Sequence, residues 1–215
     1  MKLVLHNYWR SSASHRVRIA FGLKELAYEY VTVNIIKAEQ QAEAYRARNP
    51  LAQVPTLEVT EDDGTTWSLT QSLPILEYLD ERWPERPILP KDLQLRARSR
   101  ALAEIINSGI QPLQNLSTMR AVKQLGGDEA AWPKPWIAAG LAAYAKLAAD
   151  RAGKFSVGDA PTIADCCLIP QLASARRFGV EYAQFETLVR IEQTCMALPA
   201  FANAMPDQQP DAPEQ

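Results

Sequence analysis

Two adjacent hydroxyl side chains near the start of the chain stand where an anion can be bound. Ser11 and Ser12 follow the apolar residues 3–5, and they precede residues 17–23, in which apolar side chains recur every three positions. This pattern predicts that a buried strand ends and a helix begins at the serines. The first turn of a helix has unsatisfied N–H groups and partial positive charge, which favour an anion such as a thiolate. Ser12 is therefore a candidate thiolate-binding residue, although the spacing by itself favours Ser12 or Ser14 as only a helix cap.

Two further stretches could hold a peptide next to that thiolate. Gln53-Val54-Pro55 precedes an expected strand, and a cis Val54–Pro55 bond would turn the Val54 N–H and C=O outward, where a peptide can pair with them. An ordinary trans bond is the alternative. Gln71-Ser72 begins another expected helix, whose N-terminus suits a carboxylate but can also be only a cap. Together the three motifs describe a site for the tripeptide glutathione.

The elements that must position these motifs alternate between strand and helix over residues 1–83. Strands are expected at residues 3–6, 28–33, 55–59 and 67–69, and helices at residues 12–23, 39–48 and 72–83. This order predicts a small α/β domain with a mixed sheet.

Residues 92–205 show no strand alternation and predict an all-helical second domain. Long helices rich in Ala and Leu are expected at residues 97–120 and 136–149. Thr162 and Asp165 have the spacing of a capping box, and they open an apolar helix that we expect at the centre of this domain.

Two stretches lie outside the predicted domains. Residues 84–91 contain three prolines among charged residues, which is typical of a linker. Residues 206–215 are rich in Gln, Asp and Pro, and we expect them to form a disordered tail.

The composition narrows the classes of function. The net charge of −2 gives no reason to expect a nucleic-acid partner, and the lack of an 18-residue apolar run gives none to expect a membrane span. Two histidines are too few for a metal cluster with the usual spacing. Three cysteines, two of them adjacent, do not form a disulfide framework, and no signal-peptide pattern opens the chain. We therefore expect a cytoplasmic protein in a reducing compartment.

The chain resembles the zeta class of the glutathione transferases, the family that includes maleylacetoacetate isomerase. The stretches that carry this likeness are Ser11-Ser12, residues 16–20, Gln53-Val54-Pro55, Gln71-Ser72, residues 109–117 and residues 157–159. The likeness runs from about Leu3 to Pro206. It implies a thioredoxin-like N-terminal domain with a cis Val54–Pro55 bond, an all-helical C-terminal domain and a homodimer.

The resemblance also implies roles for individual residues, with glutathione as the cofactor. Ser12 faces the glutathione sulfur with Ser11 beside it, and Val54 pairs with the cysteinyl backbone. Further implied binding positions are Gln41, Gln53, Gln71, Ser72, Gln111, Asn115 and Ser117. Arg177 matches a position that resembles a carboxylate anchor for an acidic second substrate. Arg10, directly beside the serines, is a second arginine candidate for catalysis and for binding that substrate.

The implied reaction is glutathione-dependent cis–trans isomerisation of maleylacetoacetate to fumarylacetoacetate, in aromatic amino-acid catabolism. Ala13 stands where the family usually has cysteine, and His15 replaces a common tryptophan. A related branch, glutathione-dependent maleylpyruvate isomerase, also lacks that cysteine and carries a Ser-His-Arg sequence, so maleylpyruvate is an alternative substrate. A general glutathione transferase or dehalogenase is another alternative. A non-catalytic binding protein is a third, which the intact Ser12, Val54 and Gln71 argue against.

Overall fold

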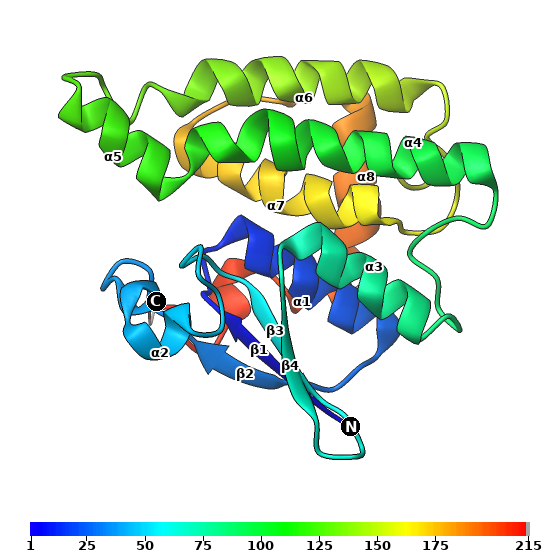
Figure 1. Ribbon diagram of the computed structural model, residues 1–215. Coiled ribbons are helices and arrows are strands. Elements are labelled where there is room, and N and C mark those ends of the chain that lie inside the picture. The colour runs from blue at the N-terminus through cyan, green and yellow to red at the C-terminus, as the bar shows by residue number, and fades with distance from the viewer. Residues whose placement is uncertain (214–215) are drawn as a thin grey trace. The chain divides into compact units, whose positions relative to one another are not determined.

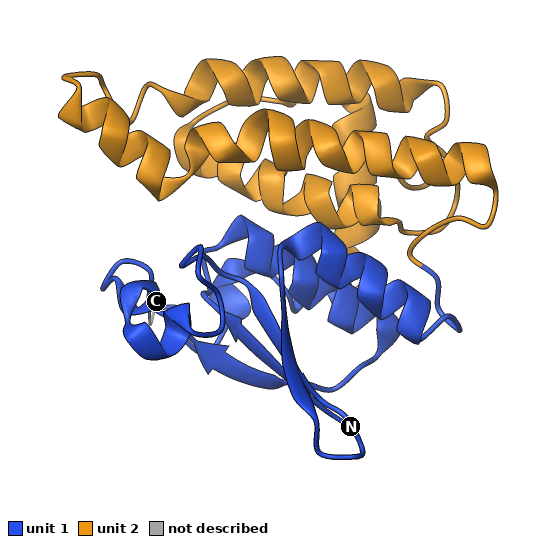
Figure 2. Cartoon of the chain, viewed as in Figure 1, with its two compact units in different colours: residues 1–87, 199–215 blue, residues 88–198 orange. Residues whose placement is uncertain are grey.

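The computed structural model describes residues 1–213, which form two compact units (Figure 1 and Figure 2). Unit 1 consists of Met1–Pro87 together with the C-terminal segment from Pro199, and unit 2 consists of Ile88–Leu198. From the sequence, the first domain is expected to end at residue 83 and the second to span residues 92–205. The structure differs mainly at Pro199, because the short helix that begins there packs on a helix of unit 1.

Unit 1 is built on a mixed sheet with the strand order β2-β1-β3-β4. The strands are β1 (Lys2–Asn7), β2 (Glu29–Thr32), β3 (Thr56–Thr60) and β4 (Thr66–Thr70). β1 pairs in parallel with β2 and antiparallel with β3, which pairs antiparallel with β4. Leu5 and Leu57 lie opposite each other on the central pair and are fully buried. The predicted thioredoxin-like α/β fold is confirmed.

Two helices lie side by side over this sheet, α1 (Ser12–Lys24) and α3 (Ser72–Arg82) (Figure 1). Their ends are joined by Lys24, whose ammonium is buried and lies 3.0 Å from the Asp80 carboxylate. The same ammonium donates to the carbonyls of Trp83 at 2.7 Å and Arg86 at 2.9 Å. All three of its N–H bonds therefore have acceptors, which offsets the cost of burying the charge.

The helix expected at residues 39–48 is broken into a 3-10 turn, Glu39–Gln41, and a single α-helical turn, α2 (Glu43–Arg46). Gln40 and Tyr45 are the buried side chains of these turns. A segment with so little apolar surface gains too little from packing to support a longer helix.

The C-terminal segment also departs from the prediction. After α9 (Pro199–Ala202), residues 206–208 form a 3-10 turn, and Asp211 accepts hydrogen bonds from Trp9 and Tyr30 of unit 1. Residues 206–213 were expected to be disordered because they bury little apolar surface, but polar contacts hold them. Residues 214 and 215 lie outside the described part of the chain.

Unit 2 is helical, as predicted. Its elements are α4 (Leu93–Glu104), a π-helical turn (Ile105–Ile110), a 3-10 turn (Gln111–Gln114), α5 (Leu116–Gln124), α6 (Pro133–Ala149), α7 (Ile163–Phe178) and α8 (Glu186–Met196). The single helix expected at residues 97–120 is interrupted between Ile105 and Asn115. Gly109 and Pro112 explain the break, because glycine weakens a helix and proline cannot donate its backbone hydrogen bond.

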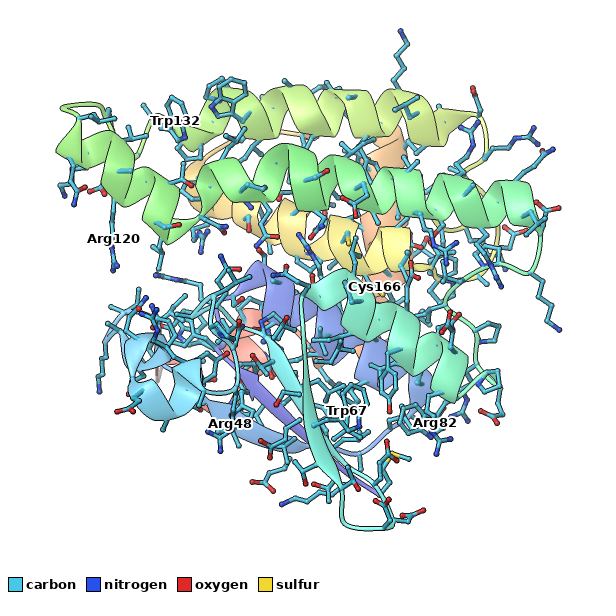
Figure 3. The ribbon with its side chains drawn as sticks, viewed as in Figure 1. Arg48, Trp67, Arg82, Arg120, Trp132 and Cys166 are labelled. Carbon is cyan, nitrogen blue, oxygen red and sulfur yellow. The ribbon has the colours of Figure 1, made fainter. Side chains whose placement is uncertain are left out.

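Helix α7 is the buried centre of unit 2, and its predicted capping box is present. Thr162 accepts from the Ala164 N–H at 3.2 Å, and the Asp165 carboxylate accepts from the Thr162 N–H at 2.7 Å. Cys166, on this helix (Figure 3), is fully buried. Burial raises the pKa of its thiol well above the usual range, so it stays protonated and is a poor nucleophile.

Candidate functional site

The turn between β1 and α1 gives the two serines different tasks. Ser11 is the N-cap of α1: its hydroxyl accepts from the Ser14 N–H at 3.2 Å, and its carbonyl accepts from the His15 N–H at 2.9 Å. Ser12 is the first helical residue, and it is half-buried. Within residues 1–213 the structure gives the Ser12 hydroxyl no hydrogen-bond partner. The capping role therefore falls to Ser11, and the Ser12 hydroxyl is available to a bound anion.

No side chain in the first turn of α1 neutralises the partial positive charge of this helix end. The first turn of α1 contains no acidic residue. Burial, together with the charges of Arg18 and Arg16, holds the pKa of His15 well below its usual range. His15 is therefore neutral at physiological pH, and it neither adds charge to the site nor neutralises an anion there.

The N-terminus of α3 is tied to that of α1 through Arg16. Arg16 lies four positions after Ser12, on the same face of α1, and its guanidinium is fully buried. It donates to the Ser72 hydroxyl at 3.0 Å. The structure thus connects two of the three predicted motifs, and Ser72 retains its own O–H as a donor.

Gln71 precedes α3 in a strained backbone conformation, with φ of 71° and ψ of 125°. A non-glycine residue in this region costs on the order of 1–3 kcal/mol, and such residues concentrate at ligand-binding sites. The Gln71 side chain is exposed and makes no capping bond to α3. The strain and the exposed side chain are consistent with a residue shaped for a ligand at this helix end.

The third motif has the expected cis bond between Val54 and Pro55. Two hydrogen bonds fix the loop that contains this bond. The Gln53 carbonyl accepts from the Tyr45 hydroxyl at 2.6 Å and from the Asn49 side-chain amide at 2.8 Å. Within residues 1–213, the Val54 backbone has no hydrogen-bond partner. It can therefore pair with an added peptide strand.

Sequence reasoning missed the supporting roles of Tyr45 and Asn49. Both side chains are buried, and Tyr45 also lies 2.9 Å from the Thr56 hydroxyl. A polar Asn immediately before Pro50 is the one signal in the sequence for this support.

The two remaining predicted site residues of unit 1, Gln41 and Arg10, each make one side-chain contact that the structure shows. Gln41 is exposed at the end of the 3-10 turn, where its side-chain oxygen accepts from Arg46 at 3.3 Å. Arg10 is half-buried, with its guanidinium carbon 5.8 Å from the centre of the Trp9 ring.

In unit 2, three predicted residues gather where the helix breaks. Gln111 opens the 3-10 turn, Asn115 is the N-cap of α5 and Ser117 follows it. The Gln111 side-chain amide donates to the Asn115 side-chain oxygen at 3.4 Å. Ser117 is exposed.

The two arginines at the end of α7 differ in their surroundings. Arg176 forms an ion pair with Glu192 and donates to the Tyr182 hydroxyl, so its guanidinium links α7 to neighbouring parts of unit 2. The Arg177 guanidinium carbon lies 4.7 Å from the centre of the Phe178 ring, and the residue is exposed. Arg176 is also exposed, and Arg177 remains the residue that the family likeness singles out as a carboxylate anchor.

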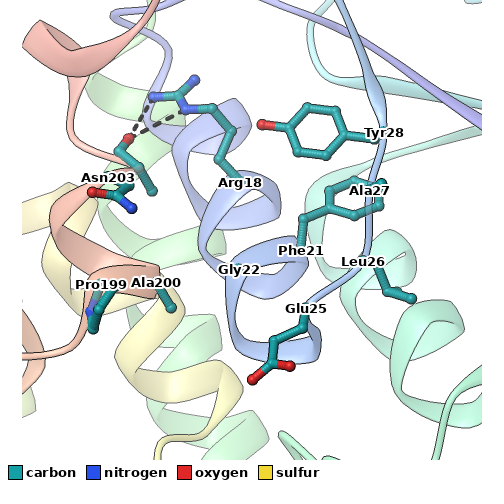
Figure 4. Close-up of a pocket in the computed structure, with 11 residues that line it drawn as sticks. Arg18, Phe21, Gly22, Glu25, Leu26, Ala27, Tyr28, Pro199, Ala200 and Asn203 are labelled. Atoms are coloured by element: carbon teal, nitrogen blue, oxygen red, sulfur yellow. Dashed lines mark hydrogen bonds between the residues drawn. The ribbon is translucent and has the colours of Figure 1, made fainter.

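A pocket of about 370 Å³ in unit 1 is separate from these residues (Figure 4). It is lined by the second half of α1 and the residues after it, from Arg18 to Tyr28, and on the other side by α9, Asn203 and Ala204. None of the predicted site residues lines it. In the range 1–213, His, Cys, Asp and Glu side chains form no group of three that could hold a metal ion, and no helix is long and apolar enough to cross a membrane.

Comparison with known proteins identifies the family. Residues 5–87 match the model for the glutathione S-transferase N-terminal domain. The chain is 44% identical to a probable maleylacetoacetate isomerase from Drosophila melanogaster, over 99% of this chain and 91% of that protein. The chain therefore belongs to the glutathione S-transferase family.

Three solved structures of two proteins show which class of the family this chain resembles. A maleylacetoacetate isomerase from Anaeromyxobacter dehalogenans 2CP-1, described with GSH bound in its active site, has a TM-score of 0.91 and 52% identity, covering 99% of this chain and 98% of that one. A second structure of that protein holds dicarboxyethyl glutathione and citrate. A maleylpyruvate isomerase, described as a bacterial zeta-class enzyme, has a TM-score of 0.91 and 41% identity, covering 98% of this chain and 100% of that one. The zeta class named for this last structure is the class that the sequence motifs indicated.

Because Ser11 caps α1 and Ser12 does not, replacing each serine by alanine should change the free energy of unfolding by a different amount. Ser11→Ala should lower the free energy of unfolding by about 1 kcal/mol, because the N-cap bond to Ser14 is lost. Ser12→Ala should change it by less than about 0.5 kcal/mol. Urea unfolding of both variants measures this, and an equal loss in both would mean that Ser12 shares the cap.

Proposed function

We propose that this protein converts maleylacetoacetate to fumarylacetoacetate by glutathione-dependent cis–trans isomerisation. The observation that carries the proposal is the N-terminus of α1, where Ser11 caps the helix and leaves the Ser12 hydroxyl for a thiolate. The isomerases of the zeta class that this chain resembles, one of them with GSH in its active site, support the same reaction.

The residues of unit 1 fit the chemical groups of glutathione. The uncommitted Ser12 hydroxyl matches its sulfur, the free backbone of Val54 matches its cysteinyl peptide groups, and the start of α3 at Gln71 and Ser72 matches its γ-glutamyl carboxylate. We assign Gln41, Gln53, Gln111, Asn115 and Ser117 as further binding positions, on the family likeness.

Bound glutathione supplies a thiolate that adds reversibly to the conjugated double bond of the maleyl substrate, which frees that bond to rotate. Ser12 donates a hydrogen bond to the sulfur anion, with Ser11 beside it. A free thiol has a pKa of about 8.5, and lowering it by two units requires about 2.7 kcal/mol. A hydrogen bond to a charged group contributes about 1.5–3 kcal/mol and a helix N-terminus about 0.3–1 kcal/mol, so their combined range of about 1.8–4 kcal/mol includes the required value.

Arginines hold the acidic second substrate in this proposal. Arg177 binds a carboxylate as a two-pronged donor, and Arg10 supplies positive charge near the reacting bond. Ala13 is buried and brings no nucleophile, so the thiol that reacts belongs to glutathione. The missing cysteine therefore does not remove the activity.

Maleylpyruvate is the alternative substrate, favoured by Ala13 and His15 in the helix that binds the thiolate. Purified protein should isomerise maleylacetoacetate with a higher kcat/KM than maleylpyruvate, and only when glutathione is present. Higher kcat/KM on maleylpyruvate would move the assignment to that branch. No isomerisation of either compound would remove the proposed function.

We further propose a homodimer that works in the cytoplasm, in aromatic amino-acid catabolism. Exposed apolar side chains on unit 2, Leu93 and Leu125 among them, support self-association. The three buried cysteines, Cys166, Cys167 and Cys195, suit a reducing compartment. Light scattering at micromolar concentration gives the oligomeric state directly.

Ser12→Ala should lower kcat about a hundredfold while the Kd of glutathione changes less than about threefold. The hydroxyl stabilises the thiolate, whereas the α3 N-terminus and Val54 hold the tripeptide. Steady-state isomerase kinetics and calorimetric titration with glutathione measure the two effects. Unchanged turnover would falsify the role of Ser12, and Ser11 would be the next candidate.

Arg177→Ala should raise the KM of a maleyl keto acid about thirtyfold, because a charge-assisted contact worth about 2 kcal/mol is lost. The KM of an uncharged electrophile should change little. Arg176→Ala is the matched control, since its guanidinium is engaged by Glu192. A larger loss in the control, or equal losses on both acceptors, would place the anchor elsewhere.

A further inference from the structure

The guanidinium of Arg18 joins the turn before the candidate thiolate site to the C-terminal segment. Its Nε and Nη2 atoms donate to the Ala204 carbonyl at 3.2 and 3.1 Å (dashed lines in Figure 4). Nη1 donates to the Asn7 side chain at 3.1 Å and the Tyr8 carbonyl at 3.4 Å, and Nη2 also donates to the Trp9 carbonyl at 3.0 Å. All five N–H groups are thereby used, so Arg18 has no donor left for a ligand in the adjoining pocket.

A second contact between the same two segments comes from Asp211. One of its carboxylate oxygens accepts from the Trp9 backbone N–H at 3.1 Å, and the other accepts from the Tyr30 hydroxyl. Burial raises the pKa of Tyr30, so the phenol stays protonated and keeps donating. Trp9 is therefore held by its carbonyl through Arg18 and by its N–H through Asp211.

The restrained turn leads directly to the serines. The Tyr8 carbonyl that receives Arg18 also accepts from the Ser11 N–H at 3.0 Å. Ser11 in turn caps α1 and fixes the backbone of Ser12. Trp9 therefore lies three residues before Ser12, inside the turn that the Tyr8–Ser11 hydrogen bond closes.

The C-terminal segment packs closely against α1, which fixes its position. α9 packs against α1 at Gly22, where a side-chain Cβ would lie only 2.9 Å from the Ala200 Cα. The absence of a side chain at Gly22 allows this approach. We call residues 199–213 the C-terminal strap.

We propose that the strap sets the geometry of the thiolate site, with Arg18 and Asp211 as positioning residues for the reaction. The proposal rests on the role of Ser12 stated above. The strap touches neither reactant; it fixes the Tyr8–Ser11 turn so that the Ser12 hydroxyl meets the sulfur in the productive orientation. Because a misplacement of about 1 Å can lower a rate a hundredfold, loosening one of the two contacts should be visible in kcat.

Asp211→Ala tests this, with Asp207→Ala as the matched control. Asp207 belongs to the same strap, but its side chain is exposed and does not contact Trp9. Its substitution therefore removes one negative charge from the strap and leaves the contact to Trp9 in place. Asp211→Ala should lower kcat about tenfold and raise the pKa of the bound glutathione thiol by about half a unit or more. The KM of glutathione should stay within about twofold, and the control should match the wild type.

The readouts separate a positioning role from a structural one. A fall in melting temperature with unchanged kcat and thiol pKa would overturn the proposal, and so would equal effects in the Asp207 control. Gly22→Ala is a second test, because the added Cβ forces α9 away from α1 without removing a polar group. We expect kcat to fall in this variant too. An unchanged kcat would contradict the proposed role of the strap. If Ser12→Ala itself left the thiol pKa unmoved, the proposed function rather than the strap would be at fault.

Discussion

The unsatisfied N–H groups at the start of α1 are the physical feature on which the rest of unit 1 depends. Their partial positive charge is useful only if no side chain neutralises it and one donor is left for a ligand. The sequence meets both conditions, because the first turn lacks acidic residues and Ser11 takes the capping task from Ser12. Burial keeps His15 neutral, so the field comes from the helix and from arginine rather than from a titrating imidazole.

The other elements of unit 1 present backbone rather than side-chain chemistry to a tripeptide. The sheet places the Val54 backbone before β3, and Tyr45 and Asn49 hold the loop behind it. Arg16 joins the starts of α1 and α3, so that the sulfur and the carboxylate of one ligand can meet two helix ends. Reactivity then comes from the bound tripeptide, which explains why Ala13 can replace a cysteine.

Local patterns were enough to predict the parts of this structure that local interactions determine. The strands β1 and β3, the start of α1 and the capping box at Thr162 and Asp165 follow from alternation, helical spacing and capping residues. The strap was missed because it is stabilised by contacts that Arg18 and Asp211 make with distant parts of the chain. Arg18 and Ala204 lie about two hundred positions apart in sequence, as do Asp211 and Trp9, and the acceptor at Ala204 is a backbone carbonyl, which every residue has. Spacing alone also could not separate Ser11 from Ser12, since both suit a cap and only the backbone conformation decides between them.

The most direct test of the helix N-terminus as a thiolate site is the pKa of the glutathione thiol bound to the wild-type protein. Ultraviolet difference titration near 240 nm follows the thiolate as the pH is raised. An apparent pKa of about 6.5 is expected, roughly two units below that of a free thiol. A value of about 8.5 or higher, with glutathione bound at saturation, would contradict the assignment of Ser12 and the start of α1 as the activating group.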